Sequence, residues 1–142
     1  MAVKKAKNIS KISDENFAKR MKDMIDKKNE YLKIVDTLHV YIAQGNAKTG
    51  NAVPSVSLIP VYNCINCKQC KDLCYDLRND CCYPGCRDNR SVNAAILEAD
   101  PSRYFMEISE AAKMYKFFRW HIGGDIIDHE YFMGMIMVAE QN

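Results

Sequence analysis

All seven cysteines of this 142-residue chain lie between Cys64 and Cys86, and this clustering constrains the fold more than any other feature. The start of the sequence has no apolar h-region of a secretory signal, so we expect a protein that is not exported. Disulfides are rare in the reducing compartments where such proteins remain, and an odd number of cysteines fits a disulfide framework poorly. The cluster therefore predicts a metal site in preference to disulfides or inert buried thiols.

The spacing of the first four cysteines predicts how they converge. They form the run Cys64-x2-Cys67-x2-Cys70-x3-Cys74. A helix that begins near Lys68 would place Cys70 and Cys74 one turn apart on one face, while a turn would aim Cys64 and Cys67 at them from the facing side. Four convergent thiolates suit tetrahedral zinc in a closed, structural site. Binding at such a site contributes directly to the folding free energy, which favours zinc in a small domain.

The same run leaves an alternative metal and alternative ligands open. It matches the cysteine run of bacterial ferredoxins, in which the fourth cysteine serves a second cluster, although Tyr75 stands where that motif has proline. A four-iron iron–sulfur cluster is therefore the alternative to zinc. The three remaining cysteines are expected to be buried or free thiols, but one of them could replace a member of the run. These reserve ligands are Cys86, first, and then Cys82 and Cys81.

Composition and charge favour one domain with a basic arm. The length suits a single domain, and the apolar content of 48% excludes a disordered chain. Four lysines and no acid fall in the first eleven residues, whereas the chain from Tyr31 onward carries 11 basic and 13 acidic residues. We expect a flexible basic arm over residues 1–12 and a single metal-binding domain over residues 13–142. This charge distribution does not indicate a dedicated nucleic-acid binder, except through the arm.

Periodicity and capping signals predict an α/β or α+β domain with a small, mostly three-stranded sheet and flanking helices. Ser13, Asp100 and Asp128 are expected to cap helices, and Pro101 suits the first helical position. Pro84 and Gly85 are expected to break the chain. The predicted strands cover residues 32–42, 53–61 and 116–122, and the predicted helices begin at Ser13, near Lys68, at about Asp88, at Pro101 and after Asp128.

The last helix is apolar on nearly every side. Phe132, Met133, Ile136 and Met137 are expected to form a partner-binding surface, since a helix of this kind is either deeply buried or covered by another molecule. Methionines also suit an adaptable interface. Its apolar run, residues 131–139, is about half a membrane span, so no membrane association is expected.

Histidines and acids gather around the Gly123-Gly124 turn. The group comprises His121, Asp125, Asp128, His129 and Glu130, and imidazoles with carboxylates can hold a second metal. We favour helix capping by Asp128, acids in the first turn and a histidine at a strand end. No catalytic residue is assigned.

Several short motifs are spread over most of residues 40–140. They are the Gly45–Gly50 loop, Ser57-Leu58-Ile59-Pro60, Cys64, Cys70, Cys74-Tyr75, Tyr83-Pro84, Asn93, Asp100-Pro101-x-Arg103-Tyr104-Phe105 and Phe118-Arg119-Trp120-His121-x-Gly123-Gly124-Asp125. Together they resemble the phage gene product 88 family, which is related to radical-SAM enzymes. The resemblance implies a phage or prophage origin, a (β/α) barrel-like fold and a cysteine-bound metal centre.

The chain departs from the implied radical-SAM pattern in two ways. A radical-SAM cluster loop needs Cys-x3-Cys-x2-Cys, but Leu77 stands where the third cysteine after Cys70 and Cys74 would be. Family members also continue past the last helix, so about three strands are expected here, like half of an open barrel. Without closure, no barrel interior would hold S-adenosylmethionine.

Taken together, these features favour a non-enzymatic, phage-encoded zinc protein in the host cytoplasm. Its expected partner is a host protein or protein–nucleic-acid complex, with inhibition of a host-defence nuclease of the CRISPR type as a concrete candidate and homodimerisation as a further possibility. One alternative is an iron–sulfur enzyme of radical-SAM ancestry that uses S-adenosylmethionine. Another is a decayed, zinc-stabilised fragment without specific activity.

Overall fold

Helices, rather than strands, form most of the part of the chain that the structure describes. The structure is a computed structural model, and it describes residues 14–45, 50, 52–65, 67 and 70–142. The predicted basic arm and the predicted cap Ser13 lie outside these residues. The α-helices are α1 (Asp14–Leu32), α2 (Tyr75–Cys82), α3 (Pro84–Ala99), α4 (Pro101–Ala112) and α5 (His129–Glu140), with short 3-10 helices at Val35–Thr37 and Lys71–Leu73.

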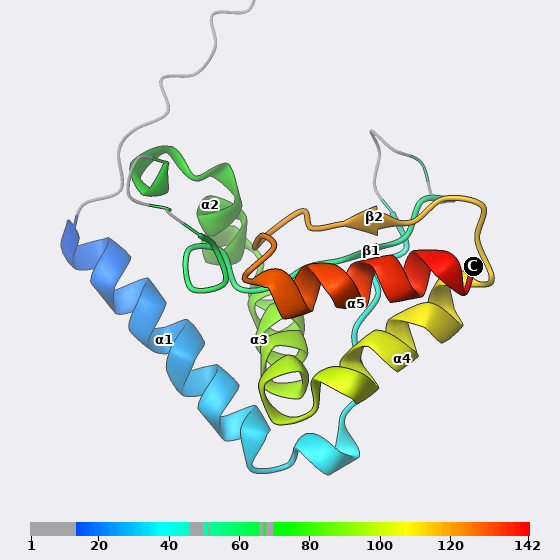
Figure 1. Cartoon of the computed structure of the whole chain (residues 1–142). Coiled ribbons are helices and arrows are strands. Elements are labelled where there is room, and N and C mark those ends of the chain that lie inside the picture. Colours follow the sequence, from blue (N-terminus) through cyan, green and yellow to red (C-terminus); the bar gives the residue numbers. More distant parts are fainter. Residues whose placement is uncertain (1–13, 46–49, 51, 66, 68–69) are drawn as a thin grey trace, which may run out of the picture.

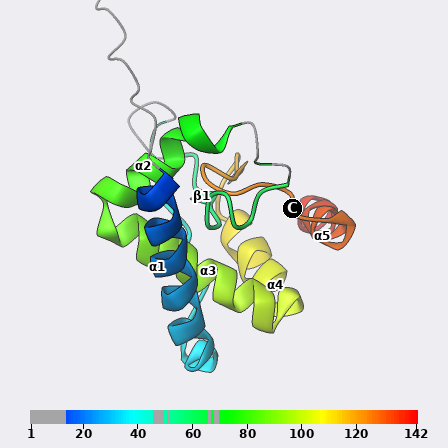
Figure 2. The same ribbon diagram turned by 90° about the vertical axis from the view of Figure 1, so that its left-hand side faces the viewer.

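Four of these helices pack in a row. α1 packs on α3, α3 on α4, and α4 on α5. Figure 2 shows α1 and α5 on opposite sides of the molecule, with α3 and α4 between them. α1 turns an apolar face toward the core, since Met24 is buried and Phe17 and Met21 pack against it.

The predicted helix caps at Asp100 and Asp128 are confirmed. The Asp100 carboxylate accepts the backbone N–H of Arg103 at 3.0 Å, and Pro101 occupies the first turn of α4. The Asp128 carboxylate accepts the N–H of Tyr131 at 2.7 Å. The chain breaks at Tyr83, between α2 and α3, but the expected start of the next helix at about Asp88 is wrong. α3 starts at Pro84, because proline suits the first helical turn, where its missing N–H needs no partner.

The predicted three-stranded, half-barrel sheet is wrong. The sheet consists of β1 (Ser55–Val56) and β2 (Arg119–Trp120), which run parallel, with Ser55 opposite Arg119. Residues 32–42 form no strand: α1 extends to Leu32, a 3-10 turn follows, and only Ala43 makes an isolated bridge to Ser55. Figure 1 shows β1 and β2 side by side. Segments 53–61 and 116–122 therefore contribute two residues each to the sheet.

The core sits where β1 and the chain after it meet α3, α4 and α5. Val56, Leu58 and Ile59 are fully buried. The parallel pairing continues beyond the strands, since the Leu58 N–H donates to the Gly123 carbonyl at 2.9 Å. Gly124 has φ +81, and a Cβ there would lie 2.7 Å from the Leu58 Cβ, so only glycine fits at this close approach.

A buried ion pair links α2 to α3. The Arg90 guanidinium donates to the Asp76 carboxylate at 2.6 Å, and the two side chains are only 7% and 4% exposed. Burial raises the pKa of Asp76 above 3.8, while the Arg90 charge opposes that rise. Gly123 lies directly against the pair, because a Cβ at this position would come within 1.9 Å of the Asp76 carboxylate.

Candidate metal centre and apolar helix face

A tight turn after the buried Ile59 and Pro60 positions Cys64. Val61 adopts φ 70, a left-handed conformation that is costly for a β-branched residue. Its N–H donates to the Cys64 sulfur at 3.2 Å. Asn63 holds the turn from inside, since its side-chain oxygen accepts the Ile59 N–H at 3.1 Å. The turn thus orients the first thiol of the run.

Cys67 and Cys70 already lie at the separation that a zinc site requires. Their sulfurs are 3.6 Å apart. Two thiolates bound to one tetrahedral zinc at the usual Zn–S length of about 2.3 Å would be separated by about 3.8 Å. This pair therefore forms one edge of a possible coordination tetrahedron without rearrangement.

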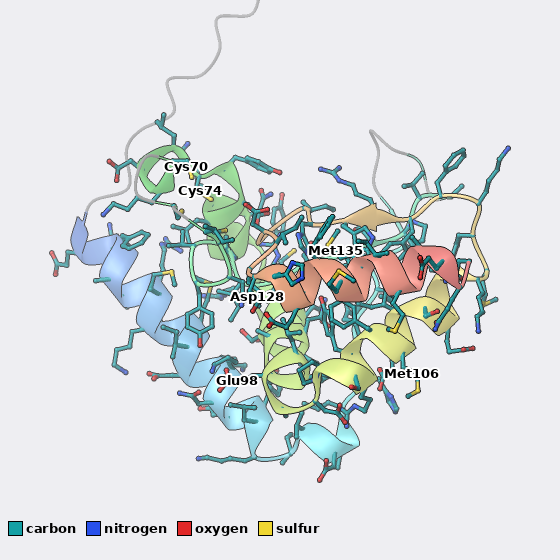
Figure 3. All side chains as sticks on the ribbon, in the orientation of Figure 1. Cys70, Cys74, Glu98, Met106, Asp128 and Met135 are labelled. Carbon is teal, nitrogen blue, oxygen red and sulfur yellow. The ribbon has the colours of Figure 1, made fainter. Side chains whose placement is uncertain are left out.

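Cys70 and Cys74 do not lie on one face of an α-helix, so this part of the expected geometry is wrong. They flank the 3-10 helix Lys71–Leu73. Cys74 is the N-cap of α2, and its sulfur accepts the Leu77 N–H at 3.4 Å. A cysteine sulfur in this capping position delays the start of the α-helix to Tyr75. Figure 3 shows Cys70 and Cys74 close together beside α2.

The four thiols share one electrostatic environment. Burial raises the pKa of Cys64, and the charges of Asp125, Cys74 and Cys70 add to the rise. The pKa of Cys67 is raised to about 12, mainly by burial. Its hydrogen bond to Cys70 and the charges of Cys70, Cys64 and Cys74 raise this pKa further, by smaller amounts. Neighbouring thiolates repel one another, so each disfavours ionisation of the others. A bound divalent cation attracts all of them and thereby stabilises the thiolate form.

The donor chemistry of the run fits zinc, but its four sulfurs are not gathered around one point. In the part of the chain that the structure describes, no three His, Cys, Asp or Glu side chains are arranged to hold a metal ion. The Cys67–Cys70 edge is in place, and Cys64 and Cys74 would have to move toward it. Asn66, Lys68 and Gln69, which lie between the ligands, are outside the described residues.

The reserve ligands occupy a different element. Cys86 is half-buried on the first turn of α3 and lines a cavity between this helix and the segment around Tyr41. Cys81 and Cys82 fall at the end of α2, and their side chains lie outside the described residues.

The outer face of α5 is apolar and exposed. Tyr131 and Val138 are buried on the inner face. On the opposite side, Phe132, Met133 and Met137 are 44%, 48% and 39% exposed, and Ile136 between them is half-buried. Positions i, i+1, i+4 and i+5 of a helix form one continuous face, so the four residues predicted to bind a partner do share a surface. We call this surface the α5 face.

Acidic residues flank the α5 face in the sequence. No lysine or arginine occurs in residues 120–142, whereas Asp125, Asp128, Glu130 and Glu140 are all exposed. A pocket of about 300 Å³ at the start of α5 is lined by apolar rings and by the carboxylates of Glu98, Asp128 and Glu130. Figure 3 shows Glu98 and Asp128 in this region. Glu98 also pairs with the buried Lys28.

His121 has a structural environment. Its Nε2 lies 2.8 Å from the Tyr131 hydroxyl, which in turn lies 3.0 Å from the Tyr104 hydroxyl. Burial lowers the pKa of His121 to about 4, so the imidazole is neutral at pH 7. This buried polar chain was not anticipated, because nothing in the sequence links residues 104, 121 and 131.

A family model described as gene product 88 matches residues 26–142. The chain belongs to the gene product 88 family. This assignment confirms the resemblance seen in the motifs, while a radical-SAM relationship does not follow from it. No curated protein and no solved structure matches the chain. Among the described helices of this gene product 88 protein, none is long and apolar enough to cross a membrane.

Proposed function

We propose that this gene product 88 protein is a non-enzymatic, metal-stabilised protein that binds a host protein through the α5 face. The observation that carries the proposal is the exposure of Phe132, Met133 and Met137 on the side of α5 that faces away from the core. Soluble proteins rarely leave such a contiguous apolar patch uncovered unless it is an interaction site. A helix of this type docks in an apolar groove of its partner.

Charge supports a protein as the partner. The acids that flank the α5 face in the sequence, Asp125, Asp128, Glu130 and Glu140, have no neighbouring basic residue in residues 120–142. A nucleic acid or an anionic lipid surface would be repelled, whereas a protein groove with a basic rim would be attracted. Guide-RNA-dependent nucleases contain positively charged channels for nucleic acid. We therefore retain inhibition of a CRISPR-type effector nuclease as the specific form of the proposal.

The thiols of Cys64, Cys67, Cys70 and Cys74 are the proposed zinc ligands. Zinc would supply a cross-link that fixes the segment between the turn at Val61 and the start of α2. This segment is linked to the chain just before α5, because the Asp125 N–H donates to the Asn63 carbonyl. Fixing the segment would therefore also help to hold the N-terminus of α5 in place.

Glutamate on the α5 face tests the binding proposal. Met133→Glu and Met137→Glu should each weaken binding to a purified, RNA-loaded CRISPR effector nuclease by about 100-fold or more, because an unpaired carboxylate would be buried at the interface. The melting temperature of the free protein should change little, since both side chains are exposed. Binding is measured by calorimetry and inhibition by DNA cleavage.

Ile34→Glu is the matched control, because Ile34 is 50% exposed but lies just after α1, before the 3-10 helix Val35–Thr37, and outside the α5 face. This variant should bind like wild type. If wild type does not bind the nuclease, this partner is wrong. If both methionine variants bind as tightly as wild type, the α5 face is not the interaction surface.

Zinc titration tests the metal site separately. We expect one zinc per chain, a lower melting temperature after chelation, and loss of zinc in Cys67→Ser and Cys70→Ser but not in the half-buried control Cys86→Ser. Zinc affinity should fall as the pH falls, because the ligands bind as thiolates and the pKa of Cys67 is about 12 without metal. A brown, iron-containing protein would instead support the iron–sulfur alternative.

A further inference from the structure

A second cavity lies against α3, away from the α5 face. It has a volume of about 330 Å³ and lies between the N-terminal half of α3, β1 and the segment around Tyr41. We call it the α3 pocket. Its size is within the range of small-molecule sites, and neither the cysteine run nor the α5 face accounts for it.

The floor of the α3 pocket contains a buried hydroxyl that lacks a partner. Ser55 is 1% exposed, and among the described residues its Oγ makes no hydrogen bond. An unsatisfied buried hydroxyl costs about 1–3 kcal/mol. Because Ser55 lines the cavity, a ligand could supply the missing hydrogen bond. By contrast, Ser57 beside it is satisfied, since its Oγ accepts the N–H of Ile122 at 3.1 Å.

The lining of the pocket is uncharged overall. Among the described lining residues, Arg90 alone carries a charge, and the Asp76 carboxylate neutralises it at 2.6 Å. The other polar groups are hydroxyls and the amides of Asn79, Asn89 and Asn93. The Asn93 amide is already bonded to the Tyr41 backbone and the Ser57 carbonyl, and Asn79 bonds Asp76. The Asn89 amide both donates and accepts, so the pocket matches a neutral ligand with mixed hydrogen-bonding edges rather than a phosphate or a carboxylate.

Two exposed tyrosines complete the site. Tyr41 and Tyr83 both line the cavity and are 47% and 61% exposed, which places their rings toward its mouth. Aromatic rings stack on nucleobases, and asparagine amides pair with the hydrogen-bonding edge of adenine. We propose that the α3 pocket binds an uncharged purine nucleoside, with Ser55 bonding to the ligand and the tyrosine rings stacking on its base.

Calorimetry with adenosine tests this proposal on the full-length protein. Wild type should bind adenosine, and AMP should bind at least tenfold more weakly because no free cation among the described lining residues meets its phosphate. Oligo(dA) tests whether the pocket instead binds a base that is part of a single-stranded nucleic acid. It should bind no better than AMP. Adenosine binding that is absent, or equalled by AMP or oligo(dA), would overturn the assignment.

Two variants locate the ligand. Ser55→Ala should weaken adenosine binding about tenfold, the value of one hydrogen bond, while the melting temperature stays equal or rises because no existing bond is lost. Tyr83→Ala should weaken binding by a similar factor. Phe117→Ala is the control, since this ring is equally exposed, at 60%, but does not line the pocket. Undiminished binding by both pocket variants would place the ligand elsewhere and contradict the proposal.

Discussion

Replacing Arg90 with alanine should destabilise the protein by about 3–5 kcal/mol. The substitution leaves the Asp76 carboxylate, only 4% exposed, buried without its partner at 2.6 Å. A domain of this size has a total stability of about 5–15 kcal/mol, so a large share of it would be lost. Urea or thermal unfolding at pH 7 measures the change.

The pH dependence of the Arg90→Ala variant identifies the cause. Burial already raises the Asp76 pKa above 3.8, and removing the opposing arginine charge raises it further. The folded state then binds a proton at a higher pH than the unfolded state, so stability falls as pH rises above 3.8 through the folded pKa. The deficit should therefore shrink in acid. A deficit that does not change with pH would indicate lost packing instead.

A double replacement provides the matched control for this pair. Asp76→Leu combined with Arg90→Met removes both charges and keeps apolar volume, so its stability should recover to within about 1–2 kcal/mol of wild type. If the double variant is as unstable as Arg90→Ala alone, the buried unpaired charge is not the source of the loss.

Gly134→Ala should also destabilise the protein, although alanine is the better helix former. A Cβ at this position in α5 would lie 2.3 Å from a ring carbon of Phe105. That ring cannot move easily, because it packs between Tyr104 and Tyr131 with centroids 5.2 and 5.1 Å away. Overpacking costs about 1–3 kcal/mol, which exceeds the gain of about 1 kcal/mol in helix propensity. Thermal unfolding should show the net loss.

Gly85→Ala makes the same chemical change in open space. Gly85 lies in the first turn of α3, and among the described residues no atom outside the local helix backbone is within 4 Å of the added Cβ. This variant should be neutral or more stable by up to about 1 kcal/mol. Equal effects at Gly85 and Gly134 would show that contact between α5 and Phe105 is looser than the structure indicates.

The sequence predicted the helices where the signals were local. Asp100 with Pro101, and Asp128, mark helix starts through bonds that span three residues, so no tertiary information was needed. Cys74 was harder, because a cysteine sulfur is an unusual cap and the spacing to Cys70 fits a helix equally well. The α3 start was missed because Pro84 can either end an element or open one.

The strands could not be predicted from alternation. Residues 32–42 alternate, but no strand among the described residues pairs with them, and α1 continues to Leu32. In residues 53–61 only Ser55 and Val56 form a strand, yet Leu58 and Ile59 are fully buried, so their apolar character reports packing rather than a sheet. Strand formation depends on a partner that is distant in sequence, which periodicity cannot supply.

The candidate sites were predicted to different extents. The α5 face follows from helical periodicity once Asp128 fixes the start of the helix, so its four residues could be named in advance. The cysteine run was found by spacing, although spacing did not give the 3-10 turn that separates Cys70 from Cys74. The α3 pocket had no sequence signal, because Ser55, Tyr83 and Asn93 come together only through the tertiary fold.

The small sheet has a consequence for how the chain reaches this structure. Ser55 and its partner Arg119 are 64 positions apart. Closing a flexible loop of that length costs roughly 4 kcal/mol in chain entropy, and two residue pairs gain too little to offset it. α2, α3 and α4 lie within this loop, and their formation would shorten the gap. We therefore expect the sheet to form late, after these helices have packed, and not to initiate folding.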